Sequence, residues 1–199
     1  MPEMALSIGT NPVSGALRAP FTGFIAVVGA VCLALCTAGY LAGADLSSLA
    51  GEPGRTGYAG PMDALTEIAL RNGSAALGLL AGIVTFGLFS GVLLGVICLY
   101  FGVLARIALD LRGSSWWWEY LPFASVELLG FLVIASGGMY PAVRSIAAVL
   151  RRPPRGGVLA TILRTYLTTT GRLLVPLAVG VGLLVLASVL EILWGVTYS

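Results

Sequence analysis

The stretch SAALGLLAGIVTFGLFSGVLLGVICLYFGVLARIAL (74–109) decides how this chain can fold. It is almost entirely apolar, which is typical of helices that lie inside a membrane. At 1.5 Å per residue, its roughly 36 residues would form about 54 Å of helix, whereas the hydrocarbon core of a bilayer is about 30 Å thick. The stretch is therefore too long for one span, and we predict two short membrane helices or a re-entrant hairpin.

The composition of the whole chain indicates an integral membrane protein. Of its 199 residues, 58% are hydrophobic and 10% are charged, whereas a soluble domain carries about 25% charged residues. Further apolar runs at 21–44, 121–143 and 173–194 are each long enough for one span. We expect an all-α transmembrane bundle that forms a single domain over 1–199, with about five membrane segments including a helical hairpin at 74–109.

The distribution of charge predicts the orientation of these segments. The loop 45–72 carries two Arg against four acidic residues, whereas 144–172 carries six Arg and no acidic residue. The positive-inside rule places 144–172 in the cytoplasm and 45–72 outside. Both placements require an even number of crossings within 74–109, with the break expected at 86–90. We therefore predict a cell-membrane protein with a cytoplasmic N-terminus and an external C-terminus.

Each of the two loops contains an amphipathic segment. In 61–72, apolar residues recur at helical spacing, which predicts a helix on the outer surface after an irregular stretch. In 158–170, a similar stripe lies beside Arg164 and predicts a helix on the anionic inner leaflet. Topology alone explains the arginines of this basic cytoplasmic loop equally well.

Three ionisable side chains, Arg106, Glu127 and Glu191, lie inside or near the ends of apolar runs. An unpaired charge at such a depth costs on the order of 2–3 kcal/mol, so we expect these groups to find partners. One interpretation is a cluster of all three that holds three helices together or lines a path for a proton or substrate. The alternative is that Arg106 pairs with Asp110, one helical turn further along the chain, while Glu191 and Arg106 reach the lipid headgroups.

Small residues recur at every fourth position within each half of the hairpin. They are Gly78 and Gly82 in the first half, and Gly87, Gly91 and Gly95 in the second. Such spacing allows two helix backbones to approach closely when apolar side chains gain nothing by leaving lipid. We predict tight packing of the hairpin on these glycines or, as an alternative, a seam between two copies of the chain.

The sequence contains no catalytic, cofactor-binding or metal-binding motif. It has no His, which removes the usual general base near neutral pH and the commonest metal ligand. Cys32 and Cys36 lie on one helix face, but without a visible third ligand we interpret them as packing residues. Ser125 near Glu127 is only a weak nucleophile candidate. We expect no enzyme activity, no cofactor and no nucleic-acid partner.

The segment Leu121-Pro122-Phe123-Ala124-Ser125-Val126-Glu127-Leu128 resembles the Leu-Pro-His-Gly-x-x-Glu-Leu signature of the stage II sporulation protein M family. The stretch from Asn72 to Gly102 is similar to the hairpin of that family, and 174–191 is similar to its closing span, which ends near Glu191. The family His and Gly fall at Phe123 and Ala124, and the Asn of its Asn-Gly element falls at Phe101. The signature residues that remain are Pro122, Gly102, Glu127 and Glu191.

This resemblance implies a multi-pass plasma-membrane protein without known catalysis, in a family whose members work with cell-wall hydrolases or with ABC-type exporters. We predict a non-enzymatic scaffold or accessory subunit of a membrane complex, in envelope remodelling or ABC-type export. Its expected partners are other membrane proteins, such as an ABC-type ATPase or a wall hydrolase, the lipid bilayer and a second copy of the chain. The alternative is a permease subunit or intramembrane transporter that uses Glu127 and Glu191.

Overall fold

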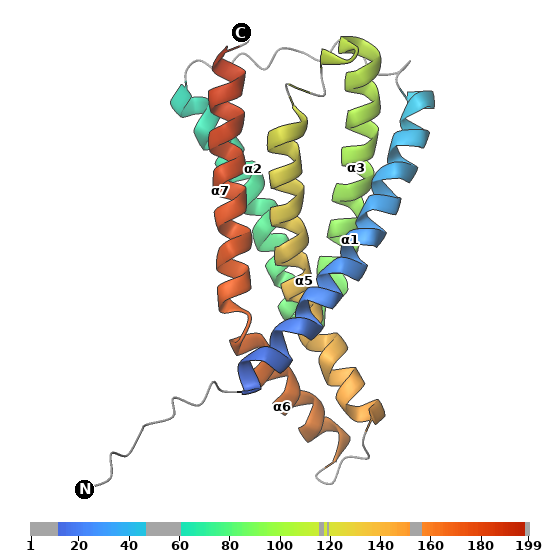
Figure 1. The fold of residues 1–199 in the computed structure, drawn as a ribbon, viewed down its shortest axis with the longest axis vertical. Coiled ribbons are helices and arrows are strands. Elements are labelled where there is room, and N and C mark those ends of the chain that lie inside the picture. Colours follow the sequence, from blue (N-terminus) through green and yellow to red (C-terminus); the bar gives the residue numbers. More distant parts are fainter. Residues whose placement is uncertain (1–11, 47–60, 116–117, 119, 152–156, 198–199) are drawn as a thin grey trace, which may run out of the picture.

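The computed structural model describes residues 12–46, 61–115, 118, 120–151 and 157–197. Within these ranges the chain contains no strand, which confirms the predicted all-α bundle (Figure 1). The first 11 residues and 47–60, which include most of the predicted irregular outer loop, lie outside the described residues. The elements are α1 (Pro12–Leu46), α2 (Pro61–Leu80), the short 3-10 helix η1 (Ala81–Ile83), α3 (Leu88–Arg112), α5 (Leu121–Arg151), α6 (Val158–Gly171) and α7 (Leu174–Thr197).

Four of the described helices are long and apolar enough to cross a membrane. Their spans are Phe21–Gly43 in α1, Leu88–Leu111 in α3, Leu121–Leu150 in α5 and Leu174–Leu193 in α7. The predicted fifth segment corresponds to α2, which runs obliquely between the same two ends of the bundle (Figure 1). It carries Asp63, Glu67 and Arg71 within its first eleven residues. In Figure 1, α1, α2, α3, α5 and α7 alternate in direction, so α1 begins at the lower end and α7 ends at the upper end.

The predicted break in 74–109 is present as a tight turn between α2 and α3. It covers η1 and residues 84–87, slightly earlier than the predicted 86–90. Phe86 and Gly87 adopt positive φ angles of 57° and 85°, and the Gly87 N–H donates to the Gly82 carbonyl at 2.6 Å. Two consecutive left-handed residues reverse the chain in few residues, and glycine at the second position carries no steric cost there. The hairpin prediction is therefore confirmed.

The first arm of the hairpin is longer than the sequence indicates. We expected a separate surface helix at 61–72, but α2 runs from Pro61 through Asn72 and Gly73 to Leu80 without interruption. A glycine inside a helix costs only about 1 kcal/mol relative to alanine, which packing against other helices offsets. The polar half of α2 therefore continues directly into its apolar half.

The basic segment 144–172 is mostly helical rather than an extended loop. Helix α5 continues to Arg151, α6 begins at Val158, and 152–156 lie outside the described residues. The helix predicted at 158–170 is confirmed as α6. Tyr166 of α6 donates a hydrogen bond to the Ile83 carbonyl of η1 and stacks on Phe86 with the ring centroids 4.6 Å apart, so α6 is anchored to the α2–α3 turn.

Helix α5 is the centre of the bundle. In the apolar 18-residue segment of its span, 44% is buried within the chain, whereas the corresponding values are 11% for α1, 17% for α3 and 22% for α7. As Figure 1 shows, α1 and α3 lie on one side of α5, and α2 and α7 on the other. The main core brings together Cys32, Ala76, Leu79, Leu94, Cys98, Phe131, Ile134, Ala135 and Leu184.

Candidate functional site

Five polar side chains from three helices meet on the α2–α7 side of the bundle. We call them the polar cluster: Arg71 and Asn72 on α2, Glu127 on α5, and Ser188 and Glu191 on α7. Asn72, Glu127 and Ser188 are buried. Glu127 lies six residues from the start of the α5 span, or about 9 Å along the helix, so the cluster is near the upper end of the bundle.

Asn72 connects the other two buried members of the cluster. Its Nδ2 donates to Ser188 Oγ at 3.4 Å, and its side chain also lies close enough to the Glu127 carboxyl group to interact with it electrostatically. Ser188 Oγ donates in turn to the Leu184 carbonyl of its own helix at 2.9 Å. An amide offers two N–H donors, so Asn72 can bind both partners at once and thereby join α2 to α5 and α7.

The cation of the cluster is Arg71. Its Nη2 lies 3.4 Å from both carboxylate oxygens of Glu191, with 59% of the Arg71 side chain exposed against 23% for Glu191. Glu127 also interacts electrostatically with Arg71 and Glu191. The cluster therefore contains two carboxyl groups and one guanidinium group.

The predicted cluster is right in bringing Glu127 near Glu191, but its cation was assigned to the wrong residue. Arg106 pairs instead with Asp110, Nε to Oδ2, at 2.9 Å, and its guanidinium lies 5.4 Å from the centre of the Tyr40 ring. The reason is geometric, because α3 packs on α1, on the opposite side of α5 from α2 and α7 (Figure 1). The alternative, pairing one turn apart on α3, is the arrangement observed.

Sequence reasoning missed Arg71, Asn72 and Ser188 as members of the site. Arg71 was placed in the outer loop, Asn72 was noted only for the family resemblance, and Ser188 was not singled out. One signal was available: Ser188 and Glu191 are three apart on α7, a spacing that places two side chains on the same helix face.

The other signature residues have structural positions. Pro122 is in the first turn of α5, where its missing N–H has no helical partner to lose. Gly102 of α3 lies against α1, because a Cβ at this position would overlap the Cys36 carbonyl group. Phe123, which occupies the position of the family His, packs edge-on against Tyr120 with the ring centroids 5.7 Å apart.

All five predicted packing glycines face other parts of the same chain. A Cβ at Gly78 would lie 2.7 Å from Leu93 Cδ2, and one at Gly82 would overlap the Ser90 side chain. Gly87 and Gly91 lie against Met139 of α5, and Gly95 faces Leu35 of α1. These contacts support the packing interpretation over a seam between copies.

The structure adds a third thiol to the predicted cysteine pair. Cys98 of α3 contacts both Cys32 and Cys36 of α1 through their side chains. All three are free cysteines in the core between α1 and α3. Cys32 and Cys98 are buried in this core, which supports the packing interpretation. In the described part of the chain, no group of three or more His, Cys, Asp or Glu side chains has the arrangement of a metal site.

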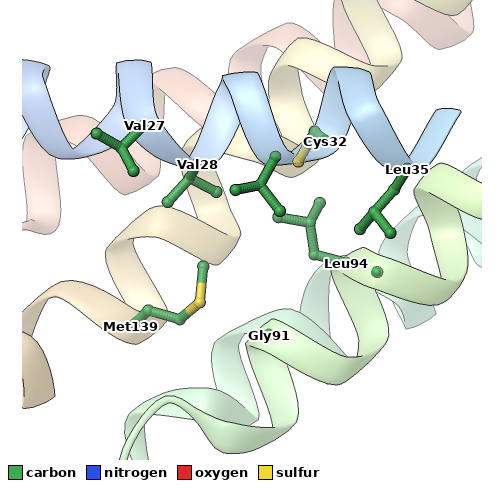
Figure 2. Close-up of a pocket in the computed structure, with 9 residues that line it drawn as sticks. Val27, Val28, Cys32, Leu35, Gly91, Leu94 and Met139 are labelled. Atoms are coloured by element: carbon green, nitrogen blue, oxygen red, sulfur yellow. The ribbon is translucent and has the colours of Figure 1, made fainter. Parts of the chain in front are cut away.

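Two grooves open on the surface of the bundle. The α2–α7 groove borders the polar cluster. Asn72 and Ser188 line it together with apolar residues such as Ala76, Leu184 and Val185. The α1–α3 groove is lined by apolar side chains, with α1 along one side, α3 along the other and Met139 of α5 between them (Figure 2). Gly91 supplies no side chain there, which leaves the groove open.

Comparison of the chain with protein-family models, curated proteins and solved structures found no match. What the fold itself defines is a multi-pass α-helical protein of the membrane-spanning type, with a polar cluster between three of its helices.

Proposed function

We propose that this chain is a non-enzymatic subunit of the cell membrane that acts as a scaffold or accessory component of a membrane complex. The polar cluster is the observation that supports the proposal. Its members interact across α2, α5 and α7: the buried Asn72 donates to Ser188 and lies beside Glu127, and the more exposed Arg71 pairs with Glu191. Hydrogen bonds between helices fix their arrangement in lipid, where apolar packing alone is weakly directional.

Only a small fraction of the outer helices is buried within the chain, which supports the same proposal. Only 11% of the most apolar window of α1 and 22% of that of α7 are buried within the chain, so most of their surface is free to face lipid or other membrane proteins. From the family resemblance, we propose an ABC-type ATPase system or a cell-wall hydrolase as the partner. In this arrangement the chain supplies a rigid surface and its partner supplies the chemistry.

A second function is favoured by the charges of the polar cluster. Two carboxyl groups, Glu127 and Glu191, share the single guanidinium group of Arg71. Ionisable groups inside a membrane commonly mark the path of a proton or an ion. The alternative proposal is therefore a permease subunit or transporter in which the surplus carboxyl group binds a proton or a monovalent cation.

The variant Glu127→Gln separates the two functions, with Glu67→Gln as the matched control because Glu67 is exposed on α2. For a scaffold, Glu127→Gln inserts and folds but loses proteins that co-purify with the wild type, and neither form moves protons in proteoliposomes. For a transporter, the wild type gives a flux that Glu127→Gln abolishes while its partners are retained. Quantitative mass spectrometry of the purified complex and a pH-sensitive dye inside the vesicles measure the two outcomes.

A further inference from the structure

The lower part of α5 extends past the level at which three other spans begin. The α1 span begins at Phe21, the α3 span at Leu88 and the α7 span at Leu174. Residues next to all three starts meet α5 at Met139 and Tyr140: Tyr140 contacts Phe21 and clusters with Leu173, and Gly87 lies against Met139. Residues 142–151 therefore continue past these span starts for about 15 Å of helix.

Helix α6 packs against this extension of α5, and the two helices project together at the lower end of the bundle (Figure 1). Tyr166 fixes the position of α6 through its hydrogen bond to the Ile83 carbonyl and its stacking on Phe86. The projection is therefore attached to the α2–α3 turn.

Both helices of the projection carry a stripe of exposed apolar side chains. On α6 the stripe recurs at every fourth residue, with exposed fractions of 70% for Leu159, 50% for Leu163 and 68% for Leu167. On α5 it consists of Val143, Ile146 and Leu150, spaced by three and four residues and 45–80% exposed. Such spacings place each stripe on one helix face. We call these six residues the α5–α6 surface.

The candidate membrane span of α5, Leu121–Leu150, is longer than a bilayer requires, because its 30 residues form about 45 Å of helix whereas the hydrocarbon core is about 30 Å thick. The headgroup layer on one side of a bilayer is only about 5–8 Å thick, as the difference between its total thickness and its hydrocarbon core indicates. The α5 extension is about twice as long. An exposed apolar surface beyond the lipid marks a site of protein interaction.

The charges around the α5–α6 surface determine what kind of protein fits it. Arg164 and Arg172 are exposed and Arg144 is partly exposed. Among the described residues, neither ion pair of the chain involves any of these three arginines. The segment 144–172 contains no acidic residue, so a second copy of the chain would bring like charges together, whereas an acidic partner would neutralise them.

We propose that the α5–α6 surface is the docking site for a soluble protein domain with an apolar groove bordered by acidic side chains. The exposed leucines of the α5–α6 surface enter such a groove, and the neighbouring arginines pair with its acidic rim. This inference rests on the proposed function as a subunit, and it specifies where and by what chemistry the partner binds.

The first test asks what surrounds the surface in a bilayer. Leu163 is replaced with spin-labelled Cys in a variant without native cysteines, with a label at Leu186 of the α7 span, 48% exposed, as the control. In phosphatidylglycerol-containing nanodiscs, we expect the label at 163 to collide with a water-soluble nickel chelate and the label at 186 to collide with oxygen. A lipid-like result at 163 overturns the proposal in favour of a membrane surface.

The second test identifies the partner and measures its binding. A photo-crosslinking amino acid at 163 is activated in cells, and the captured protein is then purified and titrated against the full chain in nanodiscs. We expect Leu163→Ser and Arg164→Glu each to weaken binding by about tenfold or more, as at interface hot spots, while Ala160→Ser has no effect. Adducts only with lipid or with a second copy overturn the proposal, and so does a captured protein whose affinity these variants leave unchanged.

The result also separates this inference from the function on which it rests. If proteins co-purify with the wild type and are lost in Glu127→Gln, but position 163 captures only lipid, the chain is a scaffold with a different docking site. If no protein co-purifies with the wild type, the proposed function itself is wrong.

Discussion

Asn72 shows how one side chain can determine the arrangement of three helices. It is 3% exposed, donates to Ser188 on α7 and lies beside Glu127 on α5. Replacing it with leucine keeps a side chain of similar size but leaves both partners without this donor. We expect Asn72→Leu to lower the free energy of unfolding by about 1–3 kcal/mol, the cost of leaving buried polar groups unsatisfied.

The measurement is the thermal unfolding midpoint in a mild detergent, with Ser74→Ala as the control. Ser74 is also on α2, but its hydroxyl is exposed and bonds only to the Arg71 carbonyl of its own helix. Equal shifts for the two variants would show that Asn72 has no special role between the helices.

Tyr166 is the residue that attaches α6 to the bundle. We expect Tyr166→Phe to cost about 0.5–1.5 kcal/mol through the lost hydrogen bond to Ile83. Tyr166→Ala, which also removes the stacking on Phe86, should cost about 3–5 kcal/mol. The exposed Tyr100, replaced with Phe, is the matched control in the same unfolding assay.

The titration of Tyr166 gives this prediction a second readout. Burial raises the pKa of its phenol, so the folded state favours the neutral form. That contribution is present below the ordinary tyrosine pKa of about 10 and is lost as the pH rises through the higher folded value. Tyr166→Phe should therefore remove part of the alkaline destabilisation of the wild type, and an identical pH profile for both forms would contradict the assignment.

The pairing of Arg71 in place of Arg106 shows the limit of sequence reasoning at the residue level. Both arginines border apolar segments, and the sequence does not specify which helix lies beside α7. The local option, Arg106 with Asp110 four residues later, could be read directly from the spacing. The partners of Glu127 and Glu191 depend on the packing of α2 against α5 and α7, which only the folded structure defines.

At the level of elements, the contact between α1 and α3 depends on glycine. A Cβ at Gly102 would overlap the Cys36 carbonyl and lie 2.7 Å from the Tyr40 nitrogen, and one at Gly39 would overlap the Leu99 carbonyl. Backbone atoms cannot move aside as a flexible side chain can. We expect Gly102→Ala to force the helices apart and to cost about 1–3 kcal/mol, as overpacking does.

Gly182 provides the control for this prediction. It also lies inside a membrane helix, α7, but no atom lies within 4 Å of the place where its Cβ would be. Gly182→Ala should be neutral or stabilising by up to about 1 kcal/mol, because alanine is the better helix former. Thermal unfolding of the two variants side by side distinguishes a packing effect from a general effect of glycine replacement.

The hairpin is the element that the sequence predicted best, and the reason is physical. A charge rule and a length limit together required an even number of crossings in 74–109, and neither depends on packing details. The extent of α2 was harder to predict, because Gly73 reads as a break unless neighbouring helices stabilise that turn. The same applies to α5, which continues through Pro141 to Arg151, where the sequence indicated a loop.

At the level of the whole molecule, α5 connects the two features that support a function. Its upper part contributes Glu127 to the polar cluster, and its lower part forms the projection with α6. Because α5 is also the most buried span, both features are built on the same central helix.

The orientation of the bundle is the last prediction. The segment 144–172, to which α6 belongs, has six arginines and no acidic residue in its sequence, so the positive-inside rule places the α6 end of the bundle in the cytoplasm. Since α1 begins at that end and α7 ends at the other (Figure 1), the two chain ends should face opposite sides. In a variant without native cysteines, we test Thr168→Cys on α6 and Ser114→Cys beyond α3, both exposed.

In right-side-out membrane vesicles, a membrane-impermeant maleimide should label position 114 and spare position 168, and inverted vesicles should give the opposite result. The two positions differ in side because α3 begins near the α6 end and α5 returns to it. Labelling of both from the same side would mean that one of these helices does not cross the bilayer. Labelling of 168 alone from outside would show that the whole bundle has the opposite orientation. An arginine-rich surface that faces outward could not bind a cytoplasmic partner.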